Sequence, residues 1–206
     1  DIFAGYVAKK MGLPIEKLII ATNQNDILHR VLESGIYKIE KVKPSISPSM
    51  DIQVSSNFER ALFDIYGQNS ELVCELMHSL KSTKEFKLSS VETKMLQDVF
   101  ESGTSSEEET SATIHSIYQD TGMLLCPHSA IGVKVALEKN KEQDIPMIIL
   151  ATAAAAKFPD AVKSACGVSP KLPDNMSDLF KRAERLTKVP NNVDEIKAII
   201  SKGINI

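Results

Sequence analysis

The stretch 47–60, which reads SPSMDIQVSSNFER, holds the densest group of side chains that could bind a small polar ligand. Hydroxyls, a carboxylate and an amide stand there among few apolar residues, so the stretch is poor material for a hydrophobic core. We expect these groups to bind a ligand where a loop meets a helix. The candidate contacts are Ser47, Ser49, Asp51, Ser55, Ser56 and Asn57. The alternative is a well-capped surface helix with Asp51 as its cap.

Three more polar side chains stand where an α/β protein binds ligands. Asn23 and Thr152 each close a short apolar run that reads as a buried strand, and ligands of open α/β sheets bind beyond the carboxyl ends of strands. His128 lies at the start of a helix led by Pro127, where an imidazole that titrates near neutral pH could contact a phosphate. The alternative for Thr152 is a hydrogen bond to backbone alone. The alternative for His128 is a surface position, or a position that supports ligand-binding residues without touching the ligand.

The order of the predicted elements indicates the fold class. Helices and strands alternate at first, a run of helices follows, and a second apolar strand comes later. We expect strands over 17–23, 36–42 and 146–152, and helices over 2–11, 25–34, 51–66, 71–81, 91–102, 106–120, 127–138, 159–165, 177–186 and 193–201. Asn25 and a Ser105 or Ser106 capping box would begin two of these helices. The chain is therefore expected to be α/β, with an open, mostly parallel sheet flanked by helices.

The same pattern suggests how the chain is organised. We expect an α/β segment over 1–69, a helical insertion over 70–125, and an α/β remainder with C-terminal helices over 126–206. Asp1 would lie at the N-cap of the first helix, whose amino end is suited to bind an anion, although an ordinary cap is the simpler interpretation.

Composition excludes several classes of function. The chain has 206 residues, a net charge of −3, 5% aromatic residues and no tryptophan, which argues against a nucleic-acid binder. No apolar run of this sequence is long enough to span a membrane, and we expect no signal peptide. The three cysteines, Cys74, Cys126 and Cys166, lack metal-ligand spacing. We expect free thiols, no metal and a cytoplasmic location.

Four segments, in order, carry a resemblance to a known family. They are ATNQND at 21–26, SPSMDIQVSSNFER at 47–60, CPHSAIGV at 126–133 and LATAAAAKFPDAV at 150–162. Together they resemble the C-terminal half of threonine synthases, which are pyridoxal-phosphate enzymes of fold type II. The resemblance implies conversion of O-phospho-L-homoserine and water into L-threonine and phosphate.

The resemblance also implies roles for individual residues. Thr152 would meet the pyridine nitrogen of pyridoxal 5'-phosphate, and Asp1 would belong to the loop that holds the cofactor phosphate. Asn23, His128 and the polar stretch at Ser47, Ser49, Asp51, Ser55 and Asn57 would bind the substrate. The Schiff-base lysine would lie upstream, in the missing N-terminal half. No catalytic residue is therefore expected in this chain, and the fragment alone is expected to be inactive.

At three positions the sequence departs from the family pattern. Cys126 replaces the usual aspartate, and Ala154 and Ala155 stand where relatives carry histidine and proline. Two alternatives therefore stay open. One is another fold-type-II lyase, such as a dehydratase or an O-phosphohomoserine lyase-like protein. The other is a non-catalytic fragment that serves as an interaction module.

Overall fold

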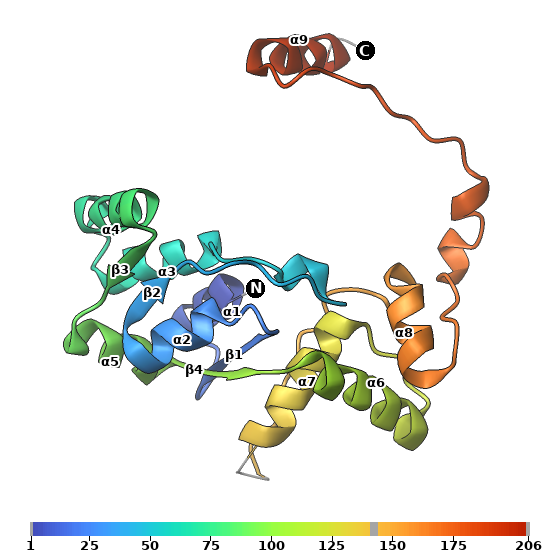
Figure 1. Ribbon diagram of the computed structural model, residues 1–206, viewed down its shortest axis with the longest axis horizontal. Coiled ribbons are helices and arrows are strands. Elements are labelled where there is room, and N and C mark those ends of the chain that lie inside the picture. The colour runs from blue at the N-terminus through green and yellow to red at the C-terminus, as the bar shows by residue number, and fades with distance from the viewer. Residues whose placement is uncertain (1, 141–143, 205–206) are drawn as a thin grey trace. The chain divides into compact units, whose positions relative to one another are not determined.

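The computed structural model describes residues 2–140 and 144–204 (Figure 1). The chain divides into two compact units, Asp1–Lys171 and Leu172–Ile206. Asp1, which was expected to contact the cofactor phosphate, lies outside the described residues.

The first unit contains both sheets and most of the helices. In chain order its elements are α1 (Ile2–Lys10), β1 (Leu18–Thr22), α2 (Ile27–Ser34), β2 (Ile36–Lys38), η1 (Pro48–Met50), α3 (Ser56–Ile65), α4 (Ser70–Thr83), β3 (Glu85–Lys87), α5 (Ser90–Val99), β4 (Phe100–Thr104), α6 (Glu107–Thr121), α7 (Pro127–Lys139), η2 (Ala155–Lys157) and α8 (Pro159–Cys166). The predicted α/β class matches this mixture of helices with a parallel strand pair.

The parallel pair of β1 and β4 is the part of the fold that positions the candidate site (Figure 1). Its register runs from Leu18 opposite Phe100 to Thr22 opposite Thr104. Because the strands are parallel, both carboxyl ends open toward the same edge. The helices α2 and α7 pack against both strands. The other pair, β2 with β3, is antiparallel.

Two apolar clusters hold the first unit together. The larger joins α1, α2 and α3 to the strands, and within it Tyr37 stacks on Phe58 and Phe86 with ring centroids 5.5 and 4.8 Å apart. The smaller cluster joins α6, α7 and α8 around Ile114, which is fully buried. Aromatic pairs at such distances add to the stability that burial provides.

Local signals predicted several helix ends correctly. Ser106 begins α6 with the expected capping box, since its hydroxyl accepts from the Glu109 N–H and the Glu109 carboxylate accepts from the Ser106 N–H. Gly35 ends α2 in the left-handed conformation, with φ 72°. Pro127 begins α7 at the first helical turn.

Other predicted boundaries were wrong where distant contacts decide the backbone. The predicted helix over 91–102 ends at Val99, because the next five residues pair with β1 as strand β4. The predicted helix over 51–66 begins only at Ser56, and Asp51 is not its cap. The predicted strand over 36–42 is reduced to β2. Asn25 does not cap α2, because its side chain bonds to a neighbouring loop instead.

The predicted strand over 146–152 is not formed. No described residue supplies a strand partner for it, and a strand without a partner leaves its backbone groups unpaired. Its apolar side chains are exposed as well, with Ile148 at 80% and Leu150 at 58%.

The second unit contains the 3-10 helices η3 (Asp174–Met176) and η4 (Leu179–Lys181) and the helix α9 (Val193–Ile204). The predicted helix over 193–201 is thus present. The one predicted over 177–186 is wrong, because only the single turn of η4 forms there. Within the described ranges, no helix is long and apolar enough to cross a membrane.

Candidate functional site

Asn23 is the centre of a buried polar cluster immediately after β1. Its side chain is fully buried. The amide nitrogen lies 2.9 Å from Ser45 Oγ, 2.9 Å from Ser47 Oγ and 2.8 Å from Asp51 Oδ1. Its carbonyl oxygen accepts from the backbone N–H of Asn25 at 2.8 Å. The structure therefore brings together three of the predicted site residues, Asn23, Ser47 and Asp51.

The carboxylate of Asp51 shapes the loop that faces Asn23. Its Oδ2 accepts the Ser45 backbone N–H at 2.8 Å, and its Oδ1 accepts the Ser45 hydroxyl at 2.6 Å. Asn25 also donates to Oδ1, at 2.9 Å. Because its carboxylate already accepts these hydrogen bonds, we assign Asp51 the role of holding the loop in shape.

Two contacts of Asn25 and one of Glu107 add further anchors. Asn25 donates to the backbone oxygen of Lys43 at 2.8 Å and accepts the Lys43 N–H at 2.8 Å. Glu107, in the first turn of α6, accepts the Ile46 N–H at 2.9 Å. Loop 43–51 is thus tied both to the end of β1 and to the start of α6. Sequence reasoning missed Ser45 and Glu107, since their partners lie outside any local pattern.

His128 joins the same loop to helix α7. Its Nε2 accepts the backbone N–H of Ser49 at 3.2 Å. Its ring stands 4.5 Å from that of Phe158, and its Nδ1 is buried without a hydrogen-bond partner among the residues that the structure describes. Burial lowers the pKa of His128 from its ordinary value, and the charge of Lys157 lowers it further, while Asp51 opposes both. This lowered pKa favours the neutral form of the ring.

Ser55 and Asn57 lie at the start of α3, and no hydrogen bond among the described residues joins their side chains to the Asn23 cluster. The Ser55 backbone N–H donates to the Tyr37 hydroxyl at 3.0 Å. Burial raises the pKa of that tyrosine, so it stays a neutral partner. Ser55 occupies the N-cap position of α3 without a side-chain capping bond.

Thr152 is exposed and its hydroxyl makes no hydrogen bond to any described residue. The alternative, in which the Thr152 hydroxyl bonds only to backbone, does not agree with the structure. Cys126, in contrast, is buried, and its sulfur accepts the Ser129 N–H at 3.4 Å as the N-cap of α7. A thiol here performs the capping that a carboxylate could perform.

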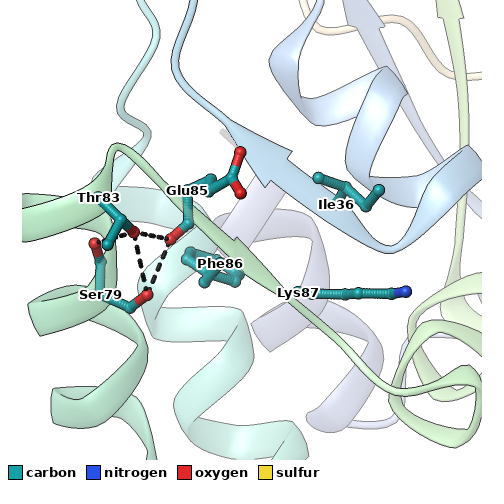
Figure 2. Close-up of a pocket in the computed structure, with 6 residues that line it drawn as sticks. All are labelled: Ile36, Ser79, Thr83, Glu85, Phe86 and Lys87. Carbon is teal, nitrogen blue, oxygen red and sulfur yellow. Dashed lines mark hydrogen bonds between the residues drawn. The ribbon is translucent and has the colours of Figure 1, made fainter.

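A cavity of about 310 Å³ lies apart from these residues, beside the β2–β3 pair (Figure 2). Two of its polar side chains are already used, since the hydroxyls of Ser79 and Thr83 both donate to the Glu85 carbonyl, at 2.9 and 3.0 Å. These bonds stabilise the turn from α4 to β3. The two hydroxyls therefore have a structural role and give no sign of a ligand site. In the part of the chain that the structure describes, no group of histidine, cysteine and acidic residues could hold a metal.

An α/β fold with buried polar groups beyond the end of a parallel strand is typical of enzymes that bind small polar ligands. Comparison with known proteins gives a more specific assignment. A family model described as "Threonine synthase, C-terminal" matches residues 129–200. The threonine synthase of Pseudomonas aeruginosa is 45% identical over 206 residues, which are 100% of this chain and 44% of that protein. The threonine synthase of Saccharomyces cerevisiae is 44% identical over 182 residues, 80% of this chain and 35% of that protein.

Solved structures agree with the sequence matches. The crystal structure of PLP-bound threonine synthase from Brucella melitensis has a TM-score of 0.89 and 52% identity, covering 98% of this chain and 43% of that one. The threonine synthase structure from yeast has a TM-score of 0.85 and 38% identity, covering 100% of this chain and 45% of that one. The chain belongs to the threonine synthase family and corresponds to its C-terminal part. It spans less than half the length of these relatives.

Proposed function

We propose that this chain is the C-terminal part of a cytoplasmic, pyridoxal-phosphate-dependent threonine synthase. The whole protein would convert O-phospho-L-homoserine and water into L-threonine and phosphate, and its N-terminal part would complete the site with the Schiff-base lysine. One observation carries the proposal: a solved PLP-bound threonine synthase matches 98% of the chain at a TM-score of 0.89 and 52% identity. The absence of a nucleic-acid or membrane partner stays an expectation from composition.

The residues present fit the cofactor at one position. The exposed hydroxyl of Thr152 has no partner among the described residues, so it is free to donate to an unprotonated pyridine nitrogen. When bound, pyridoxal phosphate supplies an electron sink for the carbanion formed from an amino acid. Asp1 is retained as a candidate for the cofactor phosphate, on the family resemblance alone.

For the substrate, we propose a division of labour within the predicted set. Asn23 and Asp51 use their hydrogen-bonding groups on each other and on Ser45, and therefore hold the loop in shape. Ser49 is exposed and its hydroxyl is unpaired among the described residues, which leaves it free for a phosphate oxygen.

The other predicted substrate contacts keep different amounts of free bonding capacity. Ser47 is fully buried, and its hydroxyl lies 2.9 Å from the Asn23 amide nitrogen and 3.0 Å from Ser45 Oγ, so it supports the loop. Ser55 and Asn57 stay proposals that rest on the family resemblance. His128 has only its Nδ1 left for a ligand, because Nε2 already accepts from Ser49.

The test is product analysis of the full protein that contains this chain. The protein is incubated with pyridoxal phosphate and O-phosphohomoserine, and phosphate and threonine are measured in the same sample. We expect threonine and phosphate in a one-to-one ratio. Phosphate without threonine, or no turnover in a protein that has bound the cofactor, would contradict the proposal.

Another fold-type-II lyase is the second candidate, because Cys126, Ala154 and Ala155 depart from the family pattern. Such an enzyme would release phosphate together with a 2-oxo acid and ammonia in place of threonine. The same incubation separates the two candidates when the organic product is identified by mass. A non-catalytic module would give none of these products.

A further inference from the structure

The contact between Ser49 and His128 connects parts of the chain that lie 79 positions apart. Ser49 belongs to η1, in the middle of loop 43–51, and His128 lies in the first turn of α7. The other anchors of this loop act before η1, through Lys43, Ser45 and Ile46, and after it, through Asp51. The imidazole is therefore the group that holds the tip of the loop.

The hydrogen bond fixes the protonation state that the ring must have. Ser49 donates a backbone N–H, so Nε2 must carry a lone pair, and the proton of the neutral ring lies on Nδ1. That Nδ1 is the buried side-chain nitrogen without a partner within the described ranges. The charged groups near the ring are Lys157, from η2, and Asp51, from the loop itself.

We propose that His128 is a positioning residue, whose neutral imidazole accepts from Ser49 through Nε2 and so holds the Ser47–Asp51 loop in place. Protonation of Nε2 would turn the acceptor into a donor and break the contact. The loop would then lose its tip anchor while the Asn23 and Glu107 anchors stay. The consequence for catalysis rests on the proposed function, but the contact and its release do not.

Two substitutions separate this role from direct contact with substrate through Nδ1. In His128→Gln, the side-chain amide oxygen can occupy the place of Nε2 and accept from Ser49. In His128→Asn, the shorter amide reaches only the place of Nδ1, so the Ser49 N–H loses its acceptor. A positioning role predicts that Gln is tolerated and Asn is not, whereas a ligand contact through Nδ1 predicts the opposite order.

The first measurement is amide hydrogen exchange of residues 45–52 in the full protein, without substrate. Loss of a hydrogen bond worth about 1 kcal/mol corresponds to roughly fivefold faster exchange. We expect this increase at Ser49 in His128→Asn but not in His128→Gln. After correction for intrinsic exchange, wild type should lose protection as the pH falls below the titration of His128, and His128→Gln should not. Equal exchange in all three proteins, or protection kept only in Asn, would overturn the proposal.

The second measurement is steady-state turnover of O-phosphohomoserine by the same three proteins. We expect His128→Gln to stay within about threefold of wild type in kcat/KM and His128→Asn to fall further. If Gln and Asn lose activity equally although Gln keeps Ser49 protected, the ring acts on the substrate and the positioning role is wrong. If wild type itself forms no threonine, the proposed function fails, and the exchange measurement still decides the role of His128.

Discussion

The amide nitrogen of Asn23 lies 2.8 Å from Oδ1 of Asp51, across 28 positions of sequence. This contact joins the residue that follows β1 to the residue that follows η1. Because Asn23 is fully buried and also bonds Ser45 and Ser47, the strand end and the loop form one hydrogen-bonded unit. Buried networks of this kind stabilise a fold only when every member is satisfied.

Replacing Asn23 with aspartate should therefore destabilise the protein. The change removes the donor that serves three oxygens and places a buried carboxylate beside the half-buried Asp51, which favours a shared proton over two adjacent charges. We expect a loss of about 3 kcal/mol in the free energy of unfolding at pH 8, with a smaller loss at pH 5. Denaturant unfolding of the full protein at both pH values measures the effect.

The matched control for this substitution is Gln24→Glu, at the neighbouring position. The Gln24 side chain donates to the Pro44 carbonyl at an exposed site, so the same change of chemistry should cost less than 1 kcal/mol. Equal losses at both positions would mean that the Asn23 cluster contributes no special stability.

Local sequence was enough to predict some of these features. The apolar run before Asn23 indicated a strand end, and the Ser106 to Glu109 spacing indicated a helix start. Both signals lie within a few residues of the feature they specify. Signals of this kind were enough for the fold class, whereas the family was inferred from the resemblance of four segments to threonine synthases and agrees with the comparisons.

The features that were not predicted from the sequence depend on contacts with residues far along the chain. The first three residues of β4 were predicted as the end of a helix over 91–102. Phe100–Thr104 becomes a strand only by pairing with β1, 82 positions earlier in register. Likewise, the hydroxyls of the Ser47–Asn57 stretch could not be ranked. Whether a serine faces Asn23, as Ser47 does, or solvent, as Ser49 does, is decided by the anchors at Glu107 and His128.

Gly103 in β4 allows the close approach of helix α7. A Cβ at this position would lie 2.7 Å from Val135 Cγ1 and 3.2 Å from its Cγ2, and Val135 is fully buried. We expect Gly103→Ala to reduce the free energy of unfolding by about 1–3 kcal/mol. The double variant Gly103→Ala/Val135→Ala should lose less than the sum of the two single changes, because the second removes the clash. Strictly additive losses in the free energy of unfolding would show that there is no steric clash between the added methyl group and Val135.

Substitutions of Thr152 should affect cofactor binding without affecting the stability of the fold. Its side chain is exposed and unpaired among the described residues, so Thr152→Val and Thr152→Ser should each change stability by less than about 0.5 kcal/mol. If the hydroxyl meets the pyridine nitrogen, Thr152→Val should weaken pyridoxal-phosphate binding by about threefold to tenfold, while Thr152→Ser keeps it. Titration of the full protein with the cofactor measures this. Equal affinities for wild type, Val and Ser would remove Thr152 from the site.

The pH dependence of stability should carry a contribution from His128 with a definite sign. Burial and the charge of Lys157 lower the pKa of His128 in the folded state, below the value near 6.5 that the unfolded chain keeps. As the pH falls, the unfolded state therefore binds the proton first, and the folded state loses stability. Above about pH 6.5 the protonation of His128 costs the folded state no stability, and stability is lost as the pH falls through the pKa of His128 in the folded state.

The measurement for this prediction is the melting temperature of wild type and of His128→Gln between pH 8 and pH 5. The difference between the two proteins cancels the other titrating groups, and glutamine has no proton to gain. We expect the melting temperature of wild type to fall more steeply with decreasing pH than that of the variant. Parallel curves would contradict the prediction, because they would mean that the environment formed by Phe158, Lys157 and Asp51 does not disfavour the charged ring.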